Sequence, residues 1–223
     1  MTPILTVTLN PALDLATSAE EVRPGPKLRC EEPRADPGGG GINVARVIRR
    51  LGGEVQAFVA LGGATGVRLA RLIEKERLAT VRFDGPGETR ESLSVTDRAT
   101  GAQYRFVMPG PTWPRAAGRA ALAAIAAAAE PDALVVLSGS LPPGLPHDLP
   151  ATLARRVAAK GARLVLDTSG ETLARAARPP RPLHVLRMDA GEAEALAASR
   201  LKTRGDTADF AENLVRQGAA EIV

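Results

Sequence analysis

A run of four consecutive glycines is the first feature of this sequence that could carry chemistry. Residues 38–41 are all glycine, and a stretch with helical spacing of apolar residues follows, opening with Ile42 and Asn43. Ordering four glycines costs conformational entropy. One use of such a run is to let backbone N–H groups approach a ligand at the positive end of a helix, where Asn43 could donate to a hydroxyl group. The alternative is a flexible loop that only leads into the helix. We favour the ligand site because tight turns rarely need more than two glycines.

The glycine run matches neither of two common nucleotide-binding motifs. A dinucleotide fingerprint would need its last glycine at position 43 or 44, which hold Asn43 and Val44. A P-loop would need a Gly-Lys-Ser or Gly-Lys-Thr sequence after the run, and none follows. The pattern therefore disfavours a nicotinamide oxidoreductase and a P-loop enzyme.

Two further loops follow apolar runs that read as strands. Residues 138–144 have the sequence SGSLPPG, and Asp167 opens the sequence DTSG. Ligands bind outside the carboxyl ends of strands in open parallel sheets, although residues 138–144 could equally form a plain connection. Asp167 could orient a hydrated cation or phosphates, or it could be a turn residue or helix cap. No Gly-x-Ser-x-Gly sequence is present, which disfavours a serine hydrolase.

Asp189 and Glu192 stand three residues apart where a strand pattern changes to a helix pattern. They could share a face and hold water molecules on Mg²⁺. The same spacing is typical of a capping box at the start of a helix. Both interpretations stay open from spacing alone.

Four charged residues lie in stretches that are not helical in pattern. Arg90 and Arg105 flank an alternating stretch, and Asp14 and Arg29 lie in another β-like stretch. Arginine suits two-pronged recognition of phosphate, and aspartate can accept hydrogen bonds from sugar hydroxyls. Singly, each would be an ordinary surface charge.

Strand and helix patterns alternate along the rest of the chain. The strands are expected at residues 4–9, 55–61, 133–137, 163–166, 183–187 and 221–223. The helices are expected at residues 42–51, 66–77, 115–130, 148–160, 171–178, 190–199 and 206–217. This alternation predicts right-handed βαβ units, and hence an α/β fold of three α/β/α layers around a parallel sheet.

Two stretches interrupt this alternation. Residues 91–107 alternate between apolar and polar, with a turn near Thr100, and predict an antiparallel hairpin. Residues 13–37 contain turn residues and short β pieces but no helix pattern. We therefore expect a single domain over 1–223, with inserts at about 12–37 and 87–108 forming a small projecting sheet.

The composition excludes several classes of protein. The 223 residues are 44% hydrophobic and 24% charged, which is typical of a globular chain and not of a disordered one. The formal charge of +4 comes from dispersed arginines, which disfavours nucleic-acid binding. Cys30 is the only cysteine, so no intrachain disulfide can form, and a zinc site is disfavoured. Neither a signal peptide nor an apolar stretch long enough to cross a membrane is present, so we expect a cytoplasmic protein with no membrane association.

Five stretches together resemble the ribokinase-like (PfkB) carbohydrate kinases, over essentially the whole chain. They are residues 8–14 (TLNPALD), 27–30 (KLRC), 37–46 (PGGGGINVAR), 103–110 (QYRFVMPG) and 138–144 (SGSLPPG). Relatives that act on tagatose 6-phosphate or fructose 1-phosphate generally have lysine at the third place of the glycine run. Gly40 stands there in this chain, which fits the branch of the minor bacterial 6-phosphofructokinases better.

The resemblance implies a Rossmann-like domain with a β-sheet lid that also forms a homodimer interface. A sugar phosphate would lie between lid and domain, and MgATP along the carboxyl ends of the later strands. The implied sugar-phosphate site consists of Asp14, Gly39, Gly40, Asn43, Arg90, Arg105 and Ser140, with the partner's Arg29. The implied nucleotide site consists of the partner's Lys27 with Arg187, Asp189 and Glu192, and Asp167 and Glu192 would hold Mg²⁺.

Two departures from the family pattern affect these expectations. Where the family usually has Lys-Pro-Asn-x-x-Glu, this chain has Arg187, Met188 and Asp189, and only Glu192 is retained. The family's Gly-Ala-Gly-Asp motif, which supplies the catalytic base and the anion hole, does not occur in the sequence. We therefore expect the base beyond Val223, name no catalytic residue, and expect no turnover from these 223 residues.

The implied reaction is the phosphorylation of fructose 6-phosphate by ATP to give fructose 1,6-bisphosphate. Two alternatives stay open: a non-catalytic protein that binds a sugar phosphate, and a kinase for tagatose 6-phosphate or fructose 1-phosphate.

Overall fold

The computed structural model of the chain describes residues 2–178 and 183–223. The strands are β1 (Ile4–Thr8), β2 (Ala12–Ala19), β3 (Arg34–Gly38), β4 (Gln56–Leu61), β5 (Ala79–Asp84), β6 (Arg90–Asp97), β7 (Gln103–Val107), β8 (Leu134–Ser138), β9 (Arg163–Asp167), β10 (Leu183–Arg187) and β11 (Ala220–Ile222). The helices are α1 (Gly40–Arg50), α2 (Gly63–Lys75), α3 (Arg115–Ala128), α4 (Leu149–Ala158), α5 (Gly170–Ala176), α6 (Ala190–Ala197) and α7 (Arg204–Arg216).

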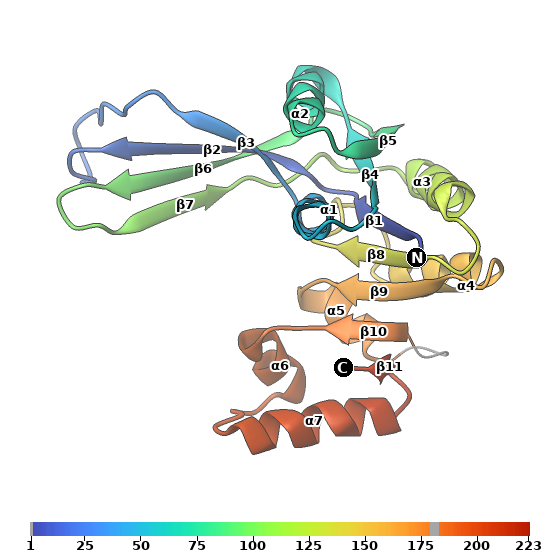
Figure 1. The fold of residues 1–223 in the computed structure, drawn as a ribbon. Coiled ribbons are helices and arrows are strands. Elements are labelled where there is room, and N and C mark those ends of the chain that lie inside the picture. The colour runs from blue at the N-terminus through green and yellow to red at the C-terminus, as the bar shows by residue number, and fades with distance from the viewer. Residues whose placement is uncertain (1, 179–182) are drawn as a thin grey trace.

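The central sheet of the described residues is parallel throughout, with the strand order β11-β10-β9-β8-β1-β4-β5 (Figure 1). Strand β1 lies in its interior between β8 and β4, and Val7 pairs with Phe58 of β4 and with Leu137 of β8. The carboxyl ends of β1, β8, β9 and β10 therefore meet at one edge of the sheet. This confirms the expected α/β fold with a parallel sheet.

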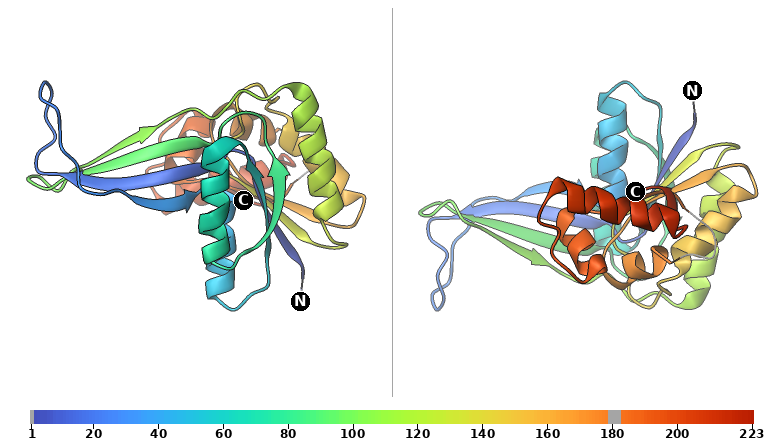
Figure 2. Two further views of the ribbon diagram at one scale, coloured as in Figure 1. Left: turned by 90° about the horizontal axis from the view of Figure 1, so that it is seen from above. Right: turned by 90° about the horizontal axis from the view of Figure 1, so that it is seen from below.

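Helices cover both faces of this sheet (Figure 2). Helices α1 and α2 pack on one face through a cluster that includes Ile42, Leu69 and Ile73, all almost fully buried. Helices α3, α4 and α5 pack on the other face through a larger cluster that includes Ile125 and Leu153. The expected three layers are confirmed. Within these helices, apolar side chains recur three and four positions apart and so form one face, and the burial of that face stabilises the packing on the sheet.

A second sheet of four strands projects from the main domain, with the order β3-β2-β6-β7 (Figures 1 and 2). The β6–β7 hairpin is antiparallel, as expected, and so is the β2–β3 pair. The two central strands, β2 and β6, run parallel, and Ala12 pairs with Arg90 at the base of the sheet. The inserts seen in the sequence thus form one sheet, which we call the small sheet.

The two faces of the small sheet differ in polarity. Residues that pair across neighbouring strands share a face. One face carries polar side chains, namely Asp14, Arg34, Asp36, Arg90, Ser92, Ser94, Gln103 and Arg105. The other face carries mainly apolar ones, namely Leu13, Leu15, Ala35, Leu93, Val95, Tyr104 and Phe106. Near the main domain, Leu13, Leu15 and Ala35 join the core beneath α2, whereas Tyr104 and Phe106 are exposed.

Strand β5 is the one strand that sequence patterns did not indicate. It lies at the outer edge of the main sheet, paired only with β4 among the described residues. Its sequence ATVRFD is half polar, and only Val81 and Phe83 turn towards the core. An edge strand with so few apolar residues gives a weak signal.

No helix within residues 2–178 and 183–223 has the length and apolar character needed to cross a membrane.

Candidate functional site

A cleft of about 750 Å³ lies between the polar face of the small sheet and the first turns of α1. Its lining includes six of the residues singled out in the sequence, namely Asp14, Gly39, Gly40, Asn43, Arg90 and Arg105. These residues come from four elements and from sequence positions up to 91 apart. The fold therefore brings together most of the expected sugar-phosphate site.

Each glycine of the run 38–41 has a local structural reason. A Cβ atom on Gly38 would lie 2.5 Å from Cγ of Asp14, and one on Gly40 would lie 2.8 Å from the carbonyl carbon of Ser138. A Cβ atom on Gly41 would lie 2.6 Å from the carbonyl oxygen of Val7. Gly39 adopts a φ of 135°, which side-chain-bearing residues rarely adopt. The glycines let α1 begin directly against β1 and β8.

The start of α1 is held by the main sheet and has no side-chain cap among the described residues. Gly39 is the N-cap residue, and the N–H of Ile42 donates to Thr8 Oγ1 at 3.0 Å. Thr8 is buried at the carboxyl end of β1. The first-turn N–H groups of α1 are thus fixed at the edge of the cleft, with the geometry that binds anions at helix starts.

Asp14 stands at the centre of the charged side chains in the cleft. Burial by the surrounding sheet raises the pKa of its carboxyl group above the ordinary 3.8, and the positive charges of Arg90 and Arg105 oppose this effect. Asp36, which pairs with Asp14 across β2 and β3, adds a second negative charge and raises the pKa further. The cleft therefore holds a carboxylate acceptor flanked by two guanidinium groups.

Arg90 is held at the base of the small sheet by three acceptors. Its guanidinium donates to the carbonyl oxygens of Asn10 and Met108, each at 3.3 Å, and to Ser92 Oγ at 3.2 Å. Burial lowers the pKa of Arg90, and Asp14 raises it. A partly buried guanidinium held by long hydrogen bonds keeps donors for an anionic ligand.

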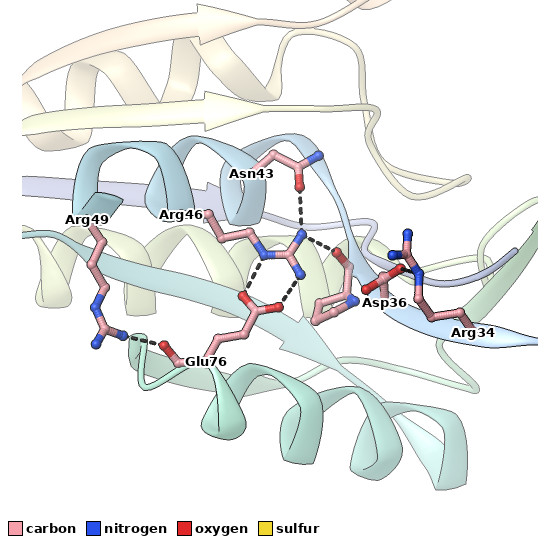
Figure 3. A network of polar contacts seen from close by, with 7 residues as sticks. Arg34, Asp36, Asn43, Arg46, Arg49 and Glu76 are labelled. Atoms are coloured by element: carbon pink, nitrogen blue, oxygen red, sulfur yellow. Dashed lines mark hydrogen bonds and ion pairs between the residues drawn. The ribbon is translucent and has the colours of Figure 1, made fainter. Parts of the chain in front are cut away.

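A second charged network lies beside Asn43, and sequence patterns gave no indication of it (Figure 3). Arg46 forms a two-pronged ion pair with Glu76, at 2.6 Å from Nε to Oε2 and 2.5 Å from Nη2 to Oε1. Its Nη1 also donates to the carbonyl oxygen of Pro37 at 2.9 Å and to Asn43 Oδ1 at 3.0 Å. Arg49 donates to the carbonyl oxygen of Glu76. Residues 46 and 76 lie 30 positions apart on different elements, so no local spacing could reveal the pair.

The carboxyl ends of β8, β9 and β10 carry a separate polar chain. Ser138 Oγ donates to Asp167 Oδ2 at 2.7 Å, and Arg187 Nη1 donates to Asp167 Oδ1 at 3.0 Å. Glu192 Oε2 lies 3.9 Å from the same nitrogen of Arg187. Hydrogen bonding to Asp167 raises the pKa of Arg187. The structure thus brings Asp167, Arg187 and Glu192 together, with the arginine between the carboxylates.

Asp189 and Glu192 form the capping box that was one of the two interpretations of their spacing. The N–H of Glu192 donates to Asp189 Oδ1, and the N–H of Asp189 donates to Glu192 Oε2, both at 2.8 Å. These bonds satisfy backbone donors at the start of α6. The described residues contain no group of three or more histidine, cysteine, aspartate or glutamate side chains placed to hold a metal ion. A role of Asp167 and Glu192 at Mg²⁺ stays a prediction.

Ser140 is not among the residues that line the cleft, but it is tied to the loop after β1. Asn10 Nδ2 donates to Ser140 Oγ at 3.0 Å. The loop at 138–144 therefore approaches the segment that leads into β2, and both border the glycine run through the contact of Gly40 with Ser138.

Lys27 and Arg29 are not part of this cleft. They lie on the connection between β2 and β3, at the end of the small sheet that is far from the main domain (Figure 1). Both are exposed, and the neighbouring Cys30 pairs with Ala19 at the outer end of β2. Within one subunit they cannot contact a ligand that is held by Asp14 and Arg90 at the base of the sheet.

The chain is similar to known proteins over nearly its whole length. Residues 8–223 match the family described as pfkB family carbohydrate kinase. The chain is 40% identical over 220 residues to the ATP-dependent 6-phosphofructokinase isozyme 2 of Mycobacterium tuberculosis. The aligned region covers 99% of this chain and 64% of that protein. It is 38% identical over 223 residues to the enzyme of the same name from Escherichia coli K12, covering 100% of this chain and 72% of that one.

A solved structure has the same fold. The crystal structure of phosphofructokinase-2 from Escherichia coli in complex with fructose-6-phosphate superposes with a TM-score of 0.91 and 37% identity, covering 99% of this chain and 72% of that chain. The chain thus spans about two thirds of the length of the relatives that it matches.

Proposed function

Since this chain belongs to the pfkB family of carbohydrate kinases, we propose that the protein transfers a phosphoryl group from ATP to a hydroxyl group of a sugar phosphate. The substrate we propose is fructose 6-phosphate, with fructose 1,6-bisphosphate as the product. The observation that carries this proposal is the cleft in which Asp14, Asn43, Arg90 and Arg105 converge beside the glycine run.

The side chains of the cleft suit the two ends of a sugar phosphate. Asp14 is an acceptor for sugar hydroxyls, and Asn43 with the N–H groups of Gly39 and Gly40 can donate to hydroxyl or phosphate oxygens. Arg90 and Arg105 supply the positive charge that a phosphate needs. Ser140, which accepts a hydrogen bond from Asn10, would add a hydroxyl group from the loop at 138–144.

ATP with its Mg²⁺ is the proposed second substrate, and it lies along the carboxyl ends of β8, β9 and β10. Arg187 is the cation nearest to the expected phosphates. Asp167 and Glu192 flank Arg187. We propose that these two carboxylates would hold the Mg²⁺ ion through its water molecules, which this ion retains in most nucleotide sites. Asp189 adds a negative charge at the start of α6 where the family usually has asparagine, and it weakens nucleotide binding in this proposal.

The work of these residues is positioning and charge stabilisation. Phosphoryl transfer has a transition state whose charge is spread over the phosphoryl oxygens, so the protein contributes mainly by placing the two substrates in line. Asp14 and Asn43 would hold the sugar so that its reacting hydroxyl faces the strand ends. The Gly-Ala-Gly-Asp motif, to which the resemblance assigns the base, does not occur in this sequence. Binding therefore tests the proposal more directly than turnover does.

We also propose that the inserts at about 12–37 and 87–108 act as a lid and join two subunits. The apolar face of the small sheet leaves Phe106 and Tyr104 exposed at 52% and 40%. A homodimer that covers this face would carry the outer connection of each small sheet towards the other subunit. It would account for Lys27 and Arg29, which lie too far out to serve their own cleft.

Calorimetric titration tests the proposed substrate. The protein should bind fructose 6-phosphate more tightly than fructose, tagatose 6-phosphate or fructose 1-phosphate. The Arg90→Ala variant should lose about 1.5–3 kcal/mol of binding free energy for the phosphorylated sugar, the range for hydrogen bonds to charged groups. Its affinity for fructose should hardly change. Equal affinity of the unchanged protein for fructose and its 6-phosphate would contradict the proposal.

A further inference from the structure

We propose that Arg46, held by Glu76, is a positioning residue that fixes the side-chain amide of Asn43 so that its NH₂ group faces the ligand in the cleft. This inference rests on the proposed function, because it deepens the sugar-phosphate site. Arg46 and Glu76 line the same cleft as Asn43, and the role proposed for Arg46 is exerted through the amide of Asn43.

The donors of arginine determine the orientation of the amide. A guanidinium group has five N–H donors and no acceptor. Arg46 Nη1 lies 3.0 Å from the amide of Asn43, so the group facing it must be the carbonyl oxygen Oδ1. The nitrogen Nδ2 then points away from Arg46 (Figure 3). Asn43 lines the cleft, and it therefore offers the ligand a hydrogen-bond donor.

Without this contact, Asn43 would have little to fix it. The residue is exposed in the first turns of α1, and an exposed asparagine side chain samples several rotamers and both amide orientations. Binding a ligand would then cost the entropy of fixing that side chain. A donor held before the ligand arrives avoids this cost.

Arg46 is itself held in place from three sides. Its side chain is 18% exposed, and the two-pronged pair with Glu76 occupies Nε and Nη2. This leaves Nη1 for the carbonyl oxygen of Pro37 and for Asn43. The pair with Glu76 raises the pKa of Arg46, so the guanidinium stays charged.

The contact also ties the amide to the glycine run. Pro37 directly precedes Gly38, and the same nitrogen of Arg46 bonds both the Pro37 carbonyl and the Asn43 amide. Glu76 is the C-cap residue that follows α2. One side chain therefore sets the relative placement of the end of α2, the glycine run and Asn43. A purely structural ion pair between the helices would use Glu76 but would not need the bond to Asn43.

A double-mutant cycle separates these two roles. We expect Arg46→Met and Asn43→Ala each to weaken fructose 6-phosphate binding by about 3- to 10-fold, the effect of one neutral hydrogen bond. Because Arg46 acts through Asn43, adding Arg46→Met to Asn43→Ala should weaken binding by no more than about twofold further. The control is Arg49→Met, which removes a neighbouring arginine that bonds Glu76 but not Asn43, and which should bind like the unchanged protein. Independent, multiplying effects of Arg46→Met and Asn43→Ala would overturn the inference.

If Arg46→Met does not fold, Arg46→Lys replaces it in the double-mutant cycle. Lysine keeps the charge beside Glu76, but its single nitrogen cannot reproduce the planar fork of arginine. The variant should fold and still show the same loss of affinity, and the same absence of loss in the Asn43→Ala background. Full affinity in Arg46→Lys would show that charge alone suffices and would overturn the inference.

A nuclear magnetic resonance measurement without ligand tests the orientation separately from the function. In ¹⁵N-labelled protein the side-chain NH₂ signal of Asn43, identified by its loss in Asn43→Ala, should have a heteronuclear NOE close to that of the α1 backbone. The NOE should fall in Arg46→Met and stay unchanged in Arg49→Met. Equal values in all three proteins would overturn the inference. If the unchanged protein does not bind fructose 6-phosphate, the proposed substrate is wrong, and this measurement alone decides whether Arg46 holds Asn43.

Discussion

Ser138 and Asp167 are joined by a hydrogen bond of 2.7 Å from Oγ to Oδ2, across the carboxyl ends of the neighbouring strands β8 and β9. Ser138 is only 2% exposed, and its main chain lies against Gly40 at the start of α1. The bond therefore connects the proposed nucleotide side of the molecule to the glycine run of the sugar-phosphate cleft.

Asp167→Ala should lower the free energy of unfolding more than Arg187→Ala, which removes the second hydrogen-bond partner of Asp167. Asp167→Ala leaves the buried Ser138 hydroxyl without its acceptor, which costs about 1–3 kcal/mol of the free energy of unfolding. Arg187→Ala removes a pair whose side chains are 56% and 33% exposed, and should cost less than about 1 kcal/mol. Urea unfolding of both variants measures the difference. A greater loss in Arg187→Ala would show that the ion pair, and not the Ser138 bond, carries the stability.

A methyl group at Gly40 should be poorly tolerated. Its Cβ atom would lie 2.8 Å from the carbonyl carbon of Ser138 and 2.9 Å from the nitrogen of Gly139, so the start of α1 must move. Gly40→Ala should lower the free energy of unfolding by about 1–3 kcal/mol and weaken fructose 6-phosphate binding.

The matched control for Gly40→Ala is Gly191→Ala in the first turn of α6. A Cβ atom on Gly191 would lie 3.5 Å from Oδ1 of Asp189, an ordinary contact. It should be neutral, or stabilising by up to about 1 kcal/mol, since alanine favours helices. Thermal unfolding and calorimetry measure both variants. Equal behaviour of the two would mean that α1 is not confined by the main sheet.

The pH dependence of stability should differ in sign between Asp14→Asn and Asp97→Asn. Burial raises the pKa of Asp14, so ionising it destabilises the folded state. The advantage of Asp14→Asn over the unchanged protein should therefore grow as the pH rises from the ordinary value of 3.8 through the raised pKa.

Hydrogen bonds from the N–H groups of Val22 and Thr100 lower the pKa of Asp97. Its contribution to stability is present above the ordinary value and is lost as the pH falls through the lowered pKa. The deficit of Asp97→Asn should therefore shrink towards low pH. Melting temperatures of the three proteins between pH 3 and pH 7 measure both trends, and parallel curves would contradict them.

Sugar binding should follow the ionisation of Asp14 as well. An ionised carboxylate accepts hydrogen bonds from sugar hydroxyls better than a protonated one. The affinity of the unchanged protein for fructose 6-phosphate should fall as the pH drops through the raised pKa of Asp14. Asp14→Asn should bind more weakly at neutral pH and lack this part of the pH dependence. Calorimetry in buffers of different pH would reveal a persisting dependence if another group were responsible.

Phe106→Glu should abolish the proposed homodimer. The substitution places a charge in the middle of the exposed apolar face of the small sheet, where Phe106 pairs with Leu93. Light scattering should give the mass of two subunits for the unchanged protein and of one for the variant. Val215→Glu, at an exposed apolar position on α7, should leave the dimer intact. A monomeric unchanged protein at high concentration would refute the proposal.

The sequence predicted the main elements of the fold because their signals are local. The β6–β7 hairpin follows from alternation and a turn, and the end of α1 follows from Gly52, which has a φ of 82°. Strand β5 was missed because an edge strand needs few apolar residues. For Asp189 and Glu192 the spacing fitted two structures, and only the observed bonds decide that the capping box forms.

The candidate site was only partly accessible from the sequence. Many of the residues that line the cleft stand in recognisable motifs, but Arg46 on α1 and Glu76 at the C-cap of α2 meet only through tertiary packing. The bond between Ser138 and Asp167 likewise depends on the pairing of β8 with β9. Such contacts follow from the arrangement of the elements and leave no trace in local spacing.

The parallel pairing of β2 and β6 makes the small sheet an arm that extends from the main domain in one direction. Both strands leave the main domain at the same end, with Ala12 beside Arg90, and run outward together to Ala19 and Asp97. Eight residues of strand span about 26 Å, so the outer ends of β2 and β6 lie about that far from Ala12 and Arg90 at the base. The parallel pair therefore acts as a spacer, which keeps Lys27 and Arg29 on the outer connection away from Asp14 and Arg90 near the base.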